Sequence, residues 1–269
     1  MRLSVLVGVL VINLIPLRAQ EDTLRSDKMT TSVKMLGLGH INVLDTYLSP
    51  ESYTGTDFHY LSHTTYDKIG SKISRQFVQQ GSFAYLNERS LRANELFAMY
   101  QLSYGWHYNW FFMERRLNLK VGGLIQGHAG VLYNMRNSNN PIQAKLGVNI
   151  APSAVVSCRF KVLNQSFMAR YEAEAPLLGL MFSPNYGQSY YELFSNGNYD
   201  HNLVPTYIVN APSFTQMFTI DFSLLKTTVR VGYLGIVDQS DVNHLKFHSY
   251  SHMLILGVVK TFNLIHIRP

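Results

Sequence analysis

Apolar and polar residues alternate with a period of two along much of this chain. Between Glu95 and Trp110 all eight even-numbered positions are apolar, whereas only Phe97 and Met99 are apolar among the eight odd-numbered positions. Successive side chains of a β-strand point to opposite faces, while a helix repeats apolar residues at steps of three and four. This segment is therefore predicted to be a strand with one apolar face.

The same alternation continues through the rest of the chain and predicts ten strands. They cover residues 33–42, 53–66, 71–85, 94–111, 117–135, 142–162, 165–182, 207–224, 228–237 and 244–262. Several of these segments run to 16–20 residues, whereas strands of soluble proteins usually have 3–10 residues. The predicted strands are long enough to cross a membrane at a tilt.

Two structures can accommodate long strands that are apolar on one face and charged on the other. A soluble sandwich, such as a periplasmic β-protein, would turn the apolar faces inward, whereas an outer-membrane barrel would turn them toward lipid. Strand length and the 17 Tyr and 15 Phe residues, which suit interfacial girdles, favour the barrel. We predict an all-β fold: a closed, antiparallel, up-and-down transmembrane β-barrel of about ten strands, with twelve possible.

The N-terminal twenty residues have the pattern of a secretory signal peptide. Arg2 precedes an apolar stretch, and a small residue, Ala19, stands at a plausible cleavage site. The apolar stretch from Ser4 to Leu17 is short for the ~20 residues of a spanning helix. The predicted layout is a signal peptide at 1–20, cleaved after Ala19 or Gln20, a lead segment at 21–32, and a barrel at 33–269.

The nine predicted connections alternate in length. Even-numbered connections are short, for example 163–164, whereas several odd-numbered ones are longer, up to 183–206. Outer-membrane barrels have short periplasmic turns, longer outer loops and an even strand count. We therefore expect both ends of the barrel domain in the periplasm and the odd-numbered connections outside.

Composition and charge exclude several other classes of protein. The chain has 13% aromatic and only 15% charged residues, the opposite of an intrinsically disordered chain. A single cysteine excludes a disulfide scaffold. Removing Arg2 and Arg18 with the signal leaves 21 basic and 17 acidic residues, a net charge of +4. That charge is too small and too dispersed to predict nucleic-acid binding.

Charged residues on the polar strand faces predict a filled lumen. In a barrel of about ten strands, opposite charges can pair across a narrow interior that side chains largely fill. A narrow channel for small polar solutes is the alternative. The candidate lumen network comprises Glu95, Lys120, Lys145, Arg170, Glu172 and Glu174.

Three strings on the expected outer side resemble a known family. They are LDTYLSPESYTG at 44–55, RNSNNP at 136–141 and FSPNYGQSYYELF at 182–194. With them the chain resembles an uncharacterised Bacteroidetes family of barrel proteins of the outer membrane, a domain of unknown function. The resemblance implies a barrel and its location but no activity. The residues at these strings form a candidate outer-loop contact surface: Asn137, Asn139, Asn140, Tyr186, Tyr190, Tyr191 and Glu192.

Catalytic and metal-binding hypotheses have weak support in the sequence. Asp200 and His201 in the longest outer loop, with Asp45 and Asp57, are candidates for a rim hydrolase acting on lipid or peptide. Adjacency in sequence does not ensure that a base lies within ~3 Å of a nucleophile. Histidines four apart, such as His59 and His63, are ~13 Å apart along a strand, too far to share a metal ion. We predict no cofactor and no metal.

The sequence thus predicts a role without naming a ligand. We expect an outer-membrane barrel that acts by surface-loop interaction or as an envelope structure, with no nucleic-acid partner. Its expected partners are outer-membrane lipid, the barrel-insertion machinery and a surface ligand or envelope protein. Whether the chain is also an enzyme is left open.

Overall fold

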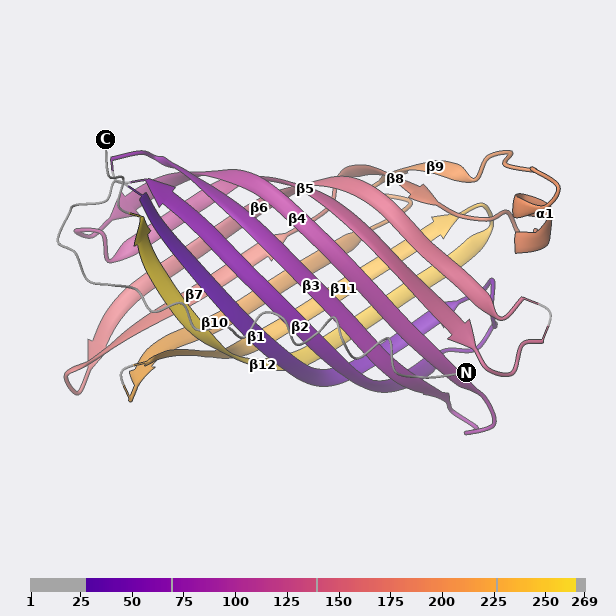
Figure 1. Cartoon of the computed structure of the whole chain (residues 1–269), viewed down its shortest axis with the longest axis horizontal. Coiled ribbons are helices and arrows are strands. Elements are labelled where there is room, and N and C mark those ends of the chain that lie inside the picture. The colour runs from indigo at the N-terminus through magenta and orange to yellow at the C-terminus, as the bar shows by residue number, and fades with distance from the viewer. Residues whose placement is uncertain (1–27, 69, 139, 226, 265–269) are drawn as a thin grey trace.

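The computed structural model describes residues 28–264, apart from 69, 139 and 226, as twelve strands and one short helix (Figure 1). The expected signal peptide lies outside the described residues. No helix in the described part of the chain is both long and apolar enough to cross a membrane. The elements are β1 (Lys28–Asp45), β2 (Tyr53–Lys68), β3 (Ile73–Glu88), β4 (Asn94–Phe112), β5 (Leu117–Asn134), β6 (Ile142–Val162), β7 (Gln165–Glu174), β8 (Leu178–Phe182), α1 (Tyr190–Phe194), β9 (Leu203–Tyr207), β10 (Ser213–Leu224), β11 (Thr227–Val242) and β12 (Leu245–Leu264).

Ten of the strands form a closed antiparallel ring. Each strand from β1 to β6 pairs with the next, β7 pairs with β10, and β10, β11 and β12 follow in turn. The seam is the pairing of the first strand with the last, which runs from Lys28 opposite Leu264 to Asp45 opposite Phe247. Strands β8 and β9 pair with each other as an extra hairpin, and β8 also pairs with β6. The predicted closed barrel of ten strands is confirmed.

Two ends of the barrel can be distinguished. The inner end carries Lys28, Leu264 and the short turns, such as Leu163–Asn164. The outer end carries the longer connections and α1 (Figure 1). One outer connection is shorter than predicted, because β11 continues to Val242 and turns at Asn243 and His244, which both have positive φ.

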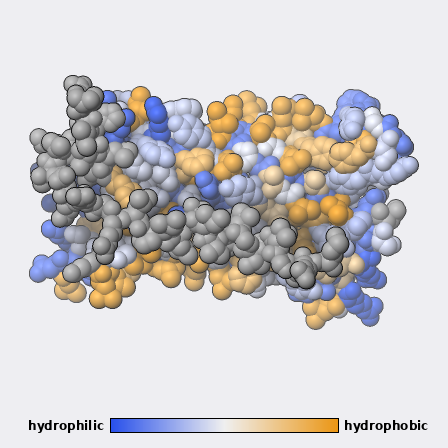
Figure 2. Space-filling model, in the orientation of Figure 1, coloured by the Kyte–Doolittle hydropathy of each residue, from blue (hydrophilic) through white to orange (hydrophobic). Residues whose placement is uncertain are grey.

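The exterior of the barrel is apolar, as the alternation predicts. Tyr100, Leu146 and Ile150 point outward and are exposed, whereas Lys145 and Glu172 are buried inside. Figure 2 shows hydrophobic side chains gathered along the wall between two more hydrophilic ends. Along the closed part of the ring each strand has two neighbours, so its backbone groups there are satisfied without water. With its even strand count and apolar exterior, this is an outer-membrane β-barrel.

The interior contains apolar layers that the sequence analysis did not predict. One cluster lies in the outer part of the lumen and is called here the outer apolar layer; it comprises Ile41, Val43, Leu48, Tyr53, Ala84, Leu86, Ala93, Phe97, Leu132 and Phe247. A second cluster includes Met35, Leu61 and Met253 on β1, β2 and β12. Buried apolar side chains therefore lie in the lumen at two levels.

The wall is interrupted where the sequence predicted two unbroken strands. Between β7 and β8, residues 175–177 leave the ladder with β10, and Pro176 has no N–H to donate there. On the partner side, β9 ends at Tyr207 and β10 begins at Ser213. Ala175 and Leu177 still donate backbone N–H groups to Pro152 and Ile150 of β6. The outer portion of this hairpin is thus held to β6 and separated from β11.

Candidate functional site

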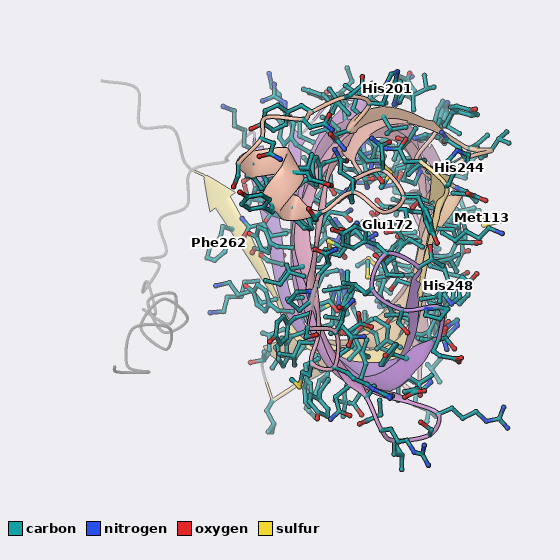
Figure 3. All side chains as sticks on the ribbon, turned by 90° about the vertical axis from the view of Figure 1, so that its right-hand side faces the viewer. Met113, Glu172, His201, His244, His248 and Phe262 are labelled. Carbon is teal, nitrogen blue, oxygen red and sulfur yellow. The ribbon has the colours of Figure 1, made fainter. Side chains whose placement is uncertain are left out.

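Polar and charged side chains from opposite walls meet across the inner half of the lumen. The guanidinium of Arg170 on β7 donates to the carboxylate of Glu172, with Nη2 2.8 Å from Oε2. Glu172 also accepts a hydrogen bond from the side chain of Gln76 on β3, and His63 on β2 lies 4.0 Å away. In the view from the outer end, Glu172 lies within the ring of strands (Figure 3). We call Arg170, Glu172, Gln76 and His63 the cross-lumen bridge.

Two further ion pairs surround the cross-lumen bridge. Arg230 donates Nε and Nη2 to the two carboxylate oxygens of Asp221 at 2.6 and 2.7 Å. Lys120 contacts Asp67 at 3.0 Å. Charge-assisted and bidentate hydrogen bonds of this kind are stronger and more directional than neutral ones. The Lys120–Asp67 pair joins β5 to β2, whereas Asp221 and Arg230 are opposed on the neighbouring strands β10 and β11.

A separate charged group lies near the outer apolar layer. The Lys145 ammonium on β6 is 2.7 Å from Asp45 on β1 and 3.9 Å from the ring centroid of Phe247. Glu95 on β4 is buried within electrostatic range of both Asp45 and Lys145. This places a cation–π contact and an ion pair at one point of the lumen.

The structure thus divides the predicted lumen network into two groups. Lys120, Arg170 and Glu172 lie in the inner half, and Glu95 and Lys145 lie at the outer end. Glu174 is half-buried and lies near Gln126, and it has no ion pair with Arg170 among the described residues. Sequence reasoning missed Asp45 and Gln76 as partners in the lumen.

The long outer connection, residues 183–202, forms an ordered segment at the rim of the barrel mouth, called here the cap (Figure 3). Its buried amide side chains join distant parts of the segment: Asn202 donates to Gln188 Oε1 at 2.7 Å and to the Ser183 carbonyl at 3.0 Å. Asn243 of the last outer turn donates to the carbonyls of Ser183 and His201. Because these bonds connect the segment to itself and to the β11–β12 turn, the cap has a fixed shape.

Tyr190 attaches helix α1 to the wall of the barrel. Its hydroxyl donates to Gln143 Oε1 and accepts from the Ala144 N–H, both at 2.7 Å. Its ring makes an edge contact with Tyr47, whose hydroxyl donates to the Gln188 carbonyl. Burial raises the pKa of Tyr190 and of Tyr47 to about 12. Both phenols therefore remain protonated donors at physiological pH.

The other predicted contact residues have different environments. Asn137 and Asn140 close the 135–141 turn, since the Asn140 N–H donates to the Asn137 side chain at 3.2 Å. Glu192 forms a capping box with Ser189 at the start of α1. Tyr186 and Tyr191 are exposed, and Asn139 lies outside the described residues. Of the six that the structure describes, Tyr186, Tyr191 and Glu192 are exposed, and Tyr186 and Tyr191 present aromatic rings to solvent.

We expect Tyr190→Phe to loosen the cap without unfolding the barrel. The change removes two hydrogen bonds, each of which contributes about 1 kcal/mol, and leaves Gln143 and the Ala144 N–H without this partner. Limited proteolysis should cleave within 183–202 roughly tenfold faster than in the parent protein. Tyr191→Phe is the matched control, because the Tyr191 side chain is 70% exposed; equal cleavage of both variants would contradict the assigned role of Tyr190.

The candidate rim-hydrolase residues occupy two different parts of the molecule. Asp200 and His201 form an ion pair of 2.7 Å on the outer surface, where both side chains are more than three-quarters exposed. Asp45 and Asp57 are buried in the lumen, where Asp57 accepts hydrogen bonds from Ser82 and Ser251. The described residues contain no group of three or more His, Cys, Asp or Glu that could hold a metal ion.

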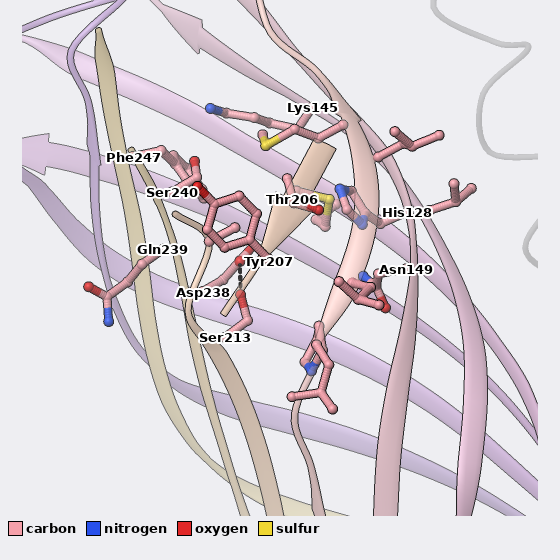
Figure 4. Close-up of a pocket in the computed structure, with 18 residues that line it drawn as sticks. His128, Lys145, Asn149, Thr206, Tyr207, Ser213, Asp238, Gln239, Ser240 and Phe247 are labelled. Carbon is pink, nitrogen blue, oxygen red and sulfur yellow. Dashed lines mark hydrogen bonds between the residues drawn. The ribbon is translucent and has the colours of Figure 1, made fainter. Parts of the chain in front are cut away.

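A small pocket lies at the interruption of the wall (Figure 4). It has a volume of about 50 Å³ and is lined by lumen residues such as His128 and Lys145 and by wall residues such as Leu178 and Tyr207. The hydroxyl of Ser213 donates to Asp238 at 2.7 Å beside it. A cavity of this volume holds one or two water molecules.

Comparisons with known proteins give a family and distant likenesses of structure. A family model described as a protein of unknown function (DUF3316) matches residues 3–269. No protein with a curated description matches the chain in sequence.

Three solved structures resemble this chain at low sequence identity. The outer membrane protease OmpT from Escherichia coli is 7% identical, with 88% of this chain and 97% of that chain covered and a TM-score of 0.47. The transport unit of the autotransporter AIDA-I from Escherichia coli is 8% identical, with 90% and 93% covered and a TM-score of 0.41. Neisserial surface protein A is 10% identical, with 85% and 96% covered and a TM-score of 0.35.

Proposed function

The chain belongs to the family of proteins of unknown function DUF3316, and because that family supplies no activity, we propose a role from the geometry of the barrel itself. We propose that it is a non-conducting outer-membrane barrel that holds a rigid cap at the cell surface for contact with a surface ligand or another envelope component. The match confirms the predicted resemblance to an uncharacterised family.

The observation that supports this proposal is that buried side chains contact one another inside the lumen at two levels. At the outer level, side chains of the outer apolar layer pack against one another inside the barrel. At the inner level, the cross-lumen bridge joins β3 to β7. A solute would have to separate both layers, and the inner one consists of buried charges that are costly to leave without partners.

The cap supports the second part of the proposal. Its backbone is held by buried Asn and Gln side chains, while its outward side exposes the large rings of Tyr186, Tyr191, Phe194 and Tyr199. Aromatic residues on a rigid support lose little conformational freedom on binding and are enriched in interfaces. This surface is better suited to contact with another macromolecule than to catalysis of a reaction.

The proposal also covers how the chain is exported and inserted into the outer membrane. We propose that residues 1–20 act as the secretory signal and that the barrel-insertion machinery assembles the chain in the outer membrane. The apolar exterior supports association with outer-membrane lipid.

Planar-bilayer recording tests the closed lumen. The purified barrel should give no steady conductance steps when inserted, because two packed layers block the path. A heat-modifiable gel shift on the same preparation is the control, since it shows that the silent protein is folded. Steady steps of nanosiemens size would overturn the proposal and favour a narrow channel for small polar solutes.

A further inference from the structure

A large cavity opens at the inner end of the barrel, on the inner side of the cross-lumen bridge. Its volume is about 430 Å³, within the range of small-molecule sites in proteins. Its walls include the inner ends of β1, β2, β4, β5, β6, β7 and β11 and residues of the turns at 70–72 and 115–116. We call this cavity the inner vestibule.

The inner vestibule is strongly basic. One carboxylate, that of Asp67, lines it together with eight cationic side chains: Lys68, Lys72, Arg115, Arg116, Lys120, Arg159, Arg170 and Arg230. Three of these cations have carboxylate partners, which are Asp67, Glu172 and Asp221. Among the described residues, five lining cations have no ion pair with a carboxylate: Lys68, Lys72, Arg115, Arg116 and Arg159. These five side chains are exposed at the inner end, and cations gathered around one opening raise the local concentration of anions.

Buried polar atoms in the vestibule wall also have no hydrogen-bond partner. Arg170 is 8% exposed and His63 is 2% exposed, yet Arg170 Nε and His63 Nε2 are both unpartnered. An unsatisfied buried donor costs roughly 1–3 kcal/mol. Both residues line the cavity, and a bound acceptor of negative charge would satisfy the guanidinium donor.

We propose that the inner vestibule is a binding site for a small soluble anion that bears a phosphate or carboxylate group. The anionic group would accept hydrogen bonds from Arg170 at the closed end of the cavity. Arg116 and Arg159 flank the opening through which the anion would enter. They lie at the inner end of the β5–β6 pair, where the Arg159 N–H donates to the Arg116 carbonyl at 2.8 Å. Because the vestibule opens at the end that carries the short turns, the ligand enters from the side that we assign to the periplasm.

The site is separate from the proposed cap surface. It lies at the opposite end of the barrel and is closed from the outer mouth by the cross-lumen bridge and the outer apolar layer. The protein would therefore bind this anion as a receptor or store, without passing it through the membrane. Loss of anion binding would leave the conductance result unchanged, so the two proposals can fail independently.

Calorimetric titration of the refolded barrel with inorganic pyrophosphate tests the site. In a zwitterionic detergent, we expect saturable binding that weakens as salt is added, because screening reduces the attraction between charges. The double variant Arg116→Gln/Arg159→Gln should bind at least tenfold more weakly. Both residues are exposed at the inner end, so the variant should still fold, as a heat-modifiable gel shift would verify.

The matched control removes the same charge at the other end of the molecule. Arg89→Gln/Arg92→Gln alters two exposed arginines in the β3–β4 connection, and this variant should bind pyrophosphate as the parent does. Equal weakening of both double variants, or no binding by the parent, would overturn the proposal. Abolition of binding in nanodiscs of anionic lipid, with binding retained in zwitterionic nanodiscs, would instead assign the site to a lipid headgroup and overturn the soluble ligand.

Discussion

Replacing Glu172 with alanine is expected to destabilise the barrel by about 3–5 kcal/mol. The carboxylate accepts hydrogen bonds from Arg170 and Gln76 inside the lumen, where all three side chains are buried. Its removal leaves the Arg170 guanidinium as a buried charge with no counter-ion of its own. Truncating one member of a buried pair costs much more than the pair itself contributes, because the remaining charge has already lost its water.

Urea unfolding of the refolded variant, followed by tryptophan fluorescence, measures this effect. Asp200→Ala is the matched control: it also removes the carboxylate of an ion pair, but one whose side chains are largely exposed. Exposed pairs contribute about 0–1 kcal/mol, so this variant should unfold nearly as the parent does. Similar midpoints for the two variants would mean that the cross-lumen bridge does not stabilise the barrel.

Replacing Ile150 with arginine is expected to cost about 2–4 kcal/mol in a bilayer. Ile150 lies near the middle of β6, opposite Ile125 of β5, and points out of the barrel with 58% of its side chain exposed. In water such an exposed position would accept a charge at little cost. In a membrane the guanidinium must reach the interface or draw water into the hydrocarbon, and either response opposes folding.

The stability of the Ile150 variant, measured by unfolding and refolding in phospholipid vesicles, distinguishes a wall that faces lipid from one that faces water. The control is Leu163→Arg, in the two-residue turn between β6 and β7, where the leucine is 97% exposed and outside the apolar belt. We expect the turn variant to change stability by less than about 1 kcal/mol. A small effect at Ile150 in vesicles would mean that this wall does not face lipid.

The strands and their faces could be predicted from the sequence because the period-two alternation has a direct physical cause. A residue such as Leu146 cannot lie in the lumen when Lys145 does, since neighbouring side chains leave opposite faces of a strand. The regular alternation of short and long connections then supported a count of ten strands. These are local constraints, and they need no knowledge of which strand faces which across the barrel.

The partners across the lumen could not be predicted in the same way. Gln76 and Glu172 lie on strands that are not neighbours in the sheet, and their contact depends on the cross-section of the closed ring. The break at Pro176 was missed because the alternation continues on both sides of it. The outer apolar layer left a signal in β1, where Ile41 and Val43 point inward although Leu36 and Leu38 face outward. Apolar residues on both faces of one strand indicate that part of the lumen is lined by apolar side chains.

The seam between β1 and β12 has a consequence for how the chain acquires its structure. Thr46 and Lys246 exchange hydrogen bonds across 200 positions of sequence, so the wall has an unpaired edge on each side until the final strand has been delivered. Bringing such distant segments together costs chain entropy before any contact is gained. Maturation should therefore be a late, concerted event that begins only after the entire polypeptide has been exported, and a chain lacking its last strand should accumulate as an open, aggregation-prone sheet.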